Sequence, residues 1–165
     1  MSLKDTIKED MKVAFKAGDT VTRSTLVMLL SVIQNRELEK RARIMKAGVV
    51  SEADVAAQAV LTDEETMEAV MSEIKKRRDA VVQYEAAGRP ELAAAEKAES
   101  ETLTKYLPEQ LSEDAVRALI TEAIASTGAA GIKDMGRVMG AVAPKTKGKF
   151  DGTRVNELVK EALSA

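Results

Sequence analysis

Apolar residues recur every three or four positions through most of the chain, which is the spacing of one face of an α-helix. Three cleanly amphipathic segments lie in the last third of the chain, over residues 116–124, 135–142 and 155–163. Upstream, the same rhythm appears over residues 3–14, 26–33 and 67–82. Aromatic residues make up only 2% of the chain, and helix-forming Ala, Glu, Lys and Leu abound. The sequence therefore predicts an all-α protein.

Glycine and proline divide the first two thirds into helices with short connections. Gly18 is expected to stop the first helix, and Asp19 to cap the second. Gly88 ends a long helix, and Pro90 suits the first turn of the helix that follows. Such short connections predict antiparallel hairpins, and hence an N-terminal helical bundle.

Two capping boxes of the form [ST]xx[DE] lie between these hairpins, at residues 51–54 and 62–65. The first predicts a short, Ala-rich helix. The second is expected to open the long helix that ends at Gly88.

A boundary between two parts is expected at residues 106–112. Pro108 disfavours a helical conformation for the residue before it. Ser112, which is followed by two acidic residues, is a good helix start. We therefore expect an N-terminal helical domain over residues 1–107 and a small three-helix domain over residues 108–165.

The amino-acid composition excludes several kinds of catalytic and metal-binding chemistry. The chain has no Cys and no His, which excludes thiolate nucleophiles, zinc–thiolate sites and the usual general base. No sequence pattern locates a catalytic residue, a metal site or a cofactor, so we expect none of them. The longest apolar run is far shorter than the roughly 20 residues that span a bilayer. The first ten residues carry no signal peptide, so a cytoplasmic protein without a membrane partner is expected.

Any nucleic-acid site must be a local basic patch, because 25 basic and 27 acidic residues give a net charge of −2. Lys145, Lys147 and Lys149 alternate with other residues in an expected loop over 144–152. Exposed lysines are common phosphate contacts, but a merely solvated turn is equally open. Within the same loop, Phe150 is expected to fold back into the small core. Asp151 should cap the last helix.

The segment before this loop raises a second question. Asp134 is expected to cap a helix, and Gly136 and Gly140 then lie four positions apart on one face. Two glycines in one soluble helix need a reason, because each costs about 1 kcal/mol relative to Ala. Close packing of another helix is one reason, and access for an RNA backbone is the other.

Two further basic runs, at residues 36–43 and 75–78, are interleaved with or flanked by acidic residues. We expect them to form exposed, salt-bridged helix faces. A second RNA-facing surface is the alternative.

Four motifs together resemble the GatB/YqeY family: AAGRPELA (86–93), YLPEQLS (106–112), KDMGRVMG (133–140) and KGKFDG (147–152). The resemblance runs from residue 7 to residue 163. Residues 45–60 are longer than the family's usual connection at that point.

The resemblance implies a function in tRNA-dependent amidation. The part over 108–165 is similar to the tail domain of the B subunit of the glutamyl/aspartyl-tRNA amidotransferase, which contacts tRNA. A tRNA-binding accessory protein without independent catalysis is therefore expected, with an aminoacyl-tRNA synthetase or amidotransferase subunits as candidate further partners. The family label, a carbon–nitrogen ligase with glutamine as amido-N-donor, is one alternative, and a helical protein–protein adaptor is the other. Charge within the matching motifs gives the expected RNA-facing residues: Lys133, Arg137, Lys145, Lys147 and Lys149, with Asn156 and Lys160 as further candidates.

Overall fold

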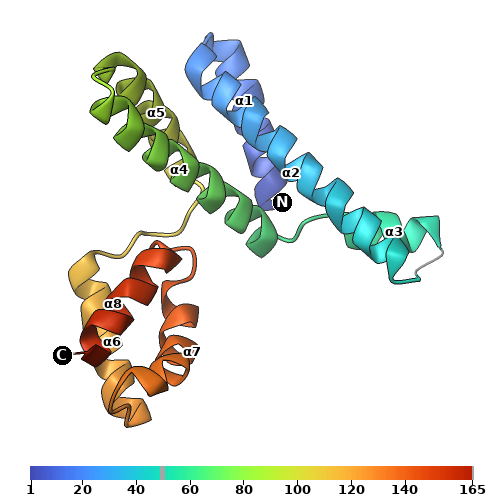
Figure 1. Ribbon diagram of the computed structural model, residues 1–165. Coiled ribbons are helices and arrows are strands. Elements are labelled where there is room, and N and C mark those ends of the chain that lie inside the picture. Colours follow the sequence, from blue (N-terminus) through green and yellow to red (C-terminus); the bar gives the residue numbers. More distant parts are fainter. Residues whose placement is uncertain (49–50, 165) are drawn as a thin grey trace. The chain divides into compact units, whose positions relative to one another are not determined.

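The computed structural model describes residues 1–48 and 51–164 (Figure 1), and over these residues it contains only helices, turns and loops. The all-α prediction is confirmed. Val49 and Val50, at the start of the expected short-helix segment, and Ala165 lie outside the described residues. Contacts divide the chain into two compact units, Met1–Tyr106 (unit 1) and Leu107–Ala165 (unit 2). That each unit is an independent domain stays a prediction. Among the described residues, no helix has the length and apolar character needed to cross a membrane.

Unit 1 is built on two helical hairpins. Helix α1 (Leu3–Ala17) lies beside α2 (Thr20–Lys46), and α4 (Asp63–Ala86) lies beside α5 (Pro90–Thr104) (Figure 1). Gly18 adopts the left-handed conformation, with φ at 72°, and its N–H donates to the last carbonyls of α1. The predicted hairpins and their stops are confirmed.

The short helix α3 (Glu52–Ala59) packs beside α2. Ser51 caps it by accepting a hydrogen bond from the N–H of Asp54. At the start of α4, the Thr62 hydroxyl accepts from the Glu65 N–H while the Glu65 carboxylate accepts from the Thr62 N–H at 2.8 Å. Both helices therefore begin where predicted, α4 with a full reciprocal capping box and α3 with a cap from the Ser51 side chain.

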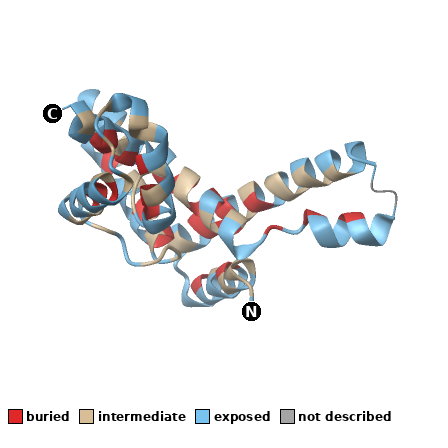
Figure 2. Cartoon of the chain, turned by 90° about the horizontal axis from the view of Figure 1, so that it is seen from below, coloured by how far each residue is buried: buried red, intermediate tan, exposed pale blue. Residues whose placement is uncertain are grey.

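Buried residues lie on the inner faces of the helices (Figure 2). Among the described residues, most charged side chains are exposed or half-buried. Arg77 is an exception, because it is only 5% exposed although the run 75–78 was expected to be an exposed face. Its guanidinium lies 3.1 Å from the buried carboxylate of Glu73 and 3.0 Å from the half-buried carboxylate of Glu99 on α5. Burial raises the pKa of Glu73, but Lys76 and Arg77 offset this effect and hold it below its usual value.

Unit 2 contains α6 (Glu113–Thr127), the 3₁₀-helix η1 (Ile132–Asp134), α7 (Met135–Thr146) and α8 (Gly152–Ser164). Ser112 caps α6 by accepting from the N–H of its third residue, as predicted. The three α-helices share one small core, whose buried members are Val116, Ile120, Ala123, Val138, Val142, Val155, Leu158 and Val159.

Phe150 packs against this core, and Asp151 accepts a hydrogen bond from the N–H of Arg154 at 2.9 Å. Both predictions for the segment before α8 are confirmed. Unit 2 thus presents one short segment between α7 and α8, and this segment is fixed to the core at its end.

Candidate nucleic-acid interface

The expected loop over residues 144–152 is shorter in the structure, because α7 continues through Pro144 to Thr146. Lys145 therefore lies on the last turn of a helix, and the prediction that all three lysines lie in a loop is wrong for it. Pro144 has no N–H, so it removes the bond to the Gly140 carbonyl, and its ring crowds that carbonyl. The N–H of Lys147 still donates to the Ala143 carbonyl at 2.9 Å, so the helix ends in a closed turn.

The turn after α7 is held by the segment that enters unit 2. Gln110 donates from Nε2 to the Gly148 carbonyl at 2.9 Å, and the N–H of Leu111 donates to the Lys149 carbonyl at 2.8 Å. Gly148 is buried and left-handed, with φ at 76°, and the lysines on either side of it are exposed. The backbone that carries Lys147 and Lys149 is therefore fixed in place. This role of Gln110 was not predicted, although the motif YLPEQLS contains the residue.

The start of α7 differs from the prediction. Asp134 occupies the cap position, but its carboxylate makes no capping bond to the helix. Instead it accepts from the N–H of Ala130 at 2.9 Å and forms an ion pair with Arg137. The Ala130 N–H, followed by Arg137, lowers the pKa of Asp134 below its usual value. Part of the charge of Arg137 is therefore balanced within the protein, whereas Lys133 beside it is exposed.

Gly136 and Gly140 do not mediate close helix packing within the described residues. Both are exposed, and a Cβ built on either one meets nothing within 4 Å. Close packing of another helix, one of the two expected reasons for these glycines, is therefore not found in the part of the chain that the structure describes. Together with Ala143 and Pro144, which are also exposed, they form a smooth strip along the outer face of α7. Access for an RNA backbone, the alternative reason for the glycines, stays open.

Replacing both glycines, in a Gly136→Ala/Gly140→Ala variant, should stabilise the protein by about 1–2 kcal/mol in total. Both backbones are helical and have room for a methyl group, so the change removes only flexibility of the unfolded chain. Urea titration followed by far-ultraviolet circular dichroism measures this gain. A loss of stability would show that the strip packs against something in solution.

Charge is segregated along unit 2. Residues 131–150 contain five Lys or Arg and one Asp, whereas the remainder of the unit contains three basic and seven acidic residues. In that remainder, Arg154 and Arg117 lie 3.1 Å and 2.7 Å from the Glu113 carboxylate. These two arginines, Arg154 first, hold the pKa of Glu113 below its usual value. The positive charge of the unit is thus concentrated on η1, α7 and the turn that follows.

The seven expected RNA-facing residues lie on two parts of unit 2. Five of them lie on η1, α7 and the turn after it, and all five are exposed: Lys133, Arg137, Lys145, Lys147 and Lys149. Lys145 lies 3.2 Å from Glu122 in an exposed ion pair, which is weak in water. Asn156 and Lys160 lie on α8, and Lys160 borders a shallow hollow together with Glu157 and Glu161. We name the five residues on α7 and its ends the α7 basic patch.

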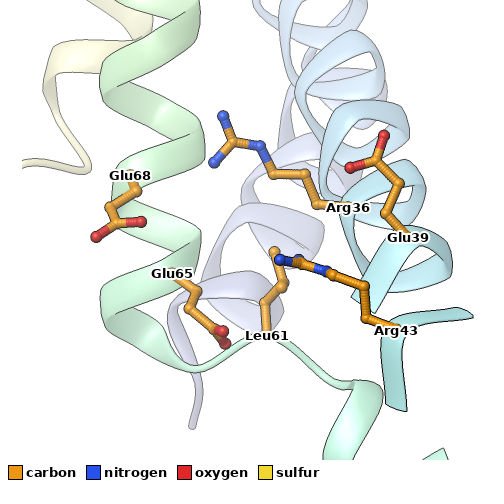
Figure 3. Close-up of a pocket in the computed structure, with 6 residues that line it drawn as sticks. All are labelled: Arg36, Glu39, Arg43, Leu61, Glu65 and Glu68. Atoms are coloured by element: carbon orange, nitrogen blue, oxygen red, sulfur yellow. The ribbon is translucent and has the colours of Figure 1, made fainter. Parts of the chain in front are cut away.

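The basic run 36–43 of unit 1 is compensated by neighbouring acids. Arg36 and Arg43 reach from α2 towards Glu65 and Glu68 on α4, and with Glu39 they line a polar pocket (Figure 3). The pocket's carboxylates outnumber its guanidinium groups. Three further ion pairs join this run to neighbouring helices. Glu37 pairs with Lys4 on α1 at 2.6 Å, Lys40 with Glu65 on α4 at 2.7 Å, and Arg41 with Glu52 on α3 at 3.5 Å. The prediction of a salt-bridged face is confirmed for this run.

Comparisons with known proteins identify the family of the chain. No curated protein matched it. The family model described as Yqey-like protein matches residues 42–163, which is well over half of the chain and includes α3 to α7 and nearly all of α8. The N-terminal part of the resemblance, residues 7–41, lies outside the matched range. The chain belongs to the YqeY-like protein family.

Proposed function

We propose that this protein is a tRNA-binding accessory protein, that the α7 basic patch holds the RNA, and that the chain has no independent catalytic activity. The observation that carries the proposal is the segregation of charge in unit 2, since the protein as a whole has a net charge of −2. Membership of the YqeY-like family supports it through the resemblance of residues 108–165 to the tail of a tRNA-dependent amidotransferase subunit.

The shape of α7 suits a polyanion. Lys133 and Lys147 mark the two ends of the patch, about 20 Å apart at the rise of a helix. Between them, the smooth strip of Gly136, Gly140 and Pro144 lets a nucleic-acid backbone approach the helix closely. In this proposal, lysines at the two ends of the patch contact phosphates. The small residues between them have no side chains long enough to hold the nucleic-acid backbone away from the helix.

Filter binding of full-length protein to bulk tRNA, from 50 to 300 mM salt, tests the proposal. Each neutralised phosphate contributes about −0.7 to −0.9 to the slope of log affinity against log salt, so three to five contacts predict a slope of roughly −2 to −4.5. Ribosomal RNA fragments of the same length serve as the comparison, and tRNA should bind more tightly.

An affinity that does not change with salt, or no binding to tRNA, would overturn the RNA proposal. In a parallel assay, glutamyl-tRNA is incubated with glutamine, ATP and the purified chain. No amidated product is expected, because the chain has neither Cys nor His to supply a usual nucleophile or general base. Turnover in that assay would contradict the accessory role and favour a ligase.

A further inference from the structure

The outer face of α2 carries a heptad pattern that nothing in unit 1 covers. Eight positions, spaced alternately three and four residues apart, are all exposed and all uncharged: Val21, Ser24, Met28, Ser31, Asn35, Leu38, Ala42 and Met45. We name these eight residues the α2 seam. Helix α2 contains eight charged residues, and none of them lies on the seam. The opposite face of the helix, with Leu26, Leu29 and Ile33, already fills the core of unit 1.

The seam is more apolar than a solvent-facing helix stripe requires. Its four large members are half exposed or more, at 51% for Val21, 54% for Met28, 56% for Leu38 and 58% for Met45. Strict three–four spacing over more than three heptads is the pattern by which two helices pack as a coiled coil. A single Asn at an inner position, here Asn35, is typical of seams that fix the register of a partner helix.

We propose that a second copy of this chain pairs its α2 with this seam in antiparallel orientation, forming a two-fold symmetric dimer. The seam is self-complementary when it is reversed about Ile33. Val21 then meets Met45, Met28 meets Leu38, Ser24 meets Ala42, and Ser31 meets Asn35. In these pairings, large apolar residues face large apolar residues, and small or polar residues face other small or polar residues. Two-fold symmetry makes each pairing occur twice.

Charges beside the seam favour the antiparallel orientation. Seven of the eight charged residues of α2 lie between Arg36 and Lys46, and only Arg23 lies in the first half. Antiparallel pairing places this charged half against the nearly uncharged first half of the partner helix. Parallel pairing would instead set Arg41 of one copy beside Lys46 of the other, twice, which is unfavourable.

The size of the seam predicts a moderate affinity. The seam covers 25 residues, from Val21 to Met45, whose ends lie about 36 Å apart along the helix. Contact along that length buries on the order of 1,000 Å² in total, at the low end of specific interfaces. Half of the seam positions are Ser, Asn or Ala and contribute little apolar area. We therefore expect a dissociation constant on the order of micromolar.

Sedimentation velocity of the full chain from 2 to 200 µM should show a mass rising from 17.8 kDa to twice that value. The Met28→Glu/Leu38→Glu variant should stay monomeric at every concentration, because it places four carboxylates in the seam. The control, Val13→Glu/Val82→Glu, replaces two other exposed apolar residues and should dimerise like the unaltered chain. A monomer throughout for the unaltered chain, or a dimer that survives the seam substitutions, would overturn the proposal.

Disulfide cross-linking tests the relative orientation of the two α2 helices. Because the chain contains no Cys, only the introduced cysteines can form a disulfide. Equimolar Ser24→Cys and Ala42→Cys chains, one carrying a mass tag, are mixed and oxidised. Antiparallel pairing predicts a disulfide between residue 24 of one copy and residue 42 of the other, at least ten times more abundant than either homodimeric product. A dominant disulfide between two copies of residue 24 would mean parallel helices and would refute the proposed arrangement.

Discussion

Replacing Lys145, Lys147 and Lys149 by Glu should weaken tRNA binding about 100-fold or more at 100 mM salt. All three side chains are exposed at the end of α7, where the positive charge of unit 2 is concentrated. Each reversal removes a phosphate contact and adds a repulsive charge near the RNA. Filter binding measures the loss, and circular dichroism should show unchanged helicity because exposed charges contribute little to stability.

A matched control separates the patch from net charge. Lys8→Glu/Lys12→Glu/Lys16→Glu changes the same number of exposed lysines, but on α1 of unit 1. This variant should keep its tRNA affinity within about threefold at the same salt, since long-range charge effects are screened over roughly 10 Å. Equal losses in both variants would mean that RNA responds to the charge of the whole protein and not to the α7 basic patch.

Replacing Arg77 by Met should lower the free energy of unfolding of unit 1 by about 3–5 kcal/mol. The substitution leaves the carboxylate of Glu73 buried without the guanidinium 3.1 Å away. It also removes the ion pair to Glu99, which joins α4 to α5. Both tyrosines, Tyr84 and Tyr106, lie in unit 1, so tyrosine fluorescence during urea titration follows this unit.

Two further variants make the measurement specific. Arg78→Met alters the exposed neighbour of Arg77 and should change stability by no more than about 0.5 kcal/mol. Glu73→Gln/Arg77→Met removes the buried charge as well, and it should recover more than half of the loss. If the single Arg77→Met variant proved as stable as Arg78→Met, the buried ion pair would not support the α4–α5 hairpin.

Local signals in the sequence were sufficient to predict where helices begin and end. Gly18 takes the left-handed conformation at its helix end, and Ser112 and the Thr62–Glu65 pair cap their helices through neighbouring N–H groups. Each of these features depends on residues within four positions of one another. The apolar rhythm over residues 116–163 likewise predicted the three helices that enclose the core of unit 2.

Features that depend on distant partners were predicted less well. Arg77 is buried because Glu99 comes from the next helix, 22 residues away, and no local pattern signals that contact. Asp134 accepts from an upstream N–H and pairs with Arg137, so its carboxylate serves the turn before α7 and not the helix. For the candidate site, sequence located the lysines, but their division between a helix and a fixed turn required the structure.

The proline inside α7 has a chemical consequence for the kind of polyanion that this helix can select. Pro144 has no hydrogen to donate, so the carbonyl oxygen of Gly140 lacks the donor that an unbroken helix would supply. Gly140 is exposed and has no side chain of its own, although the ring of Pro144 crowds that oxygen on one side. A ribose 2′-hydroxyl can donate to it, and deoxyribose has no such group. If RNA binds along α7 as proposed, this main-chain acceptor would favour RNA over DNA without help from the lysines of the α7 basic patch.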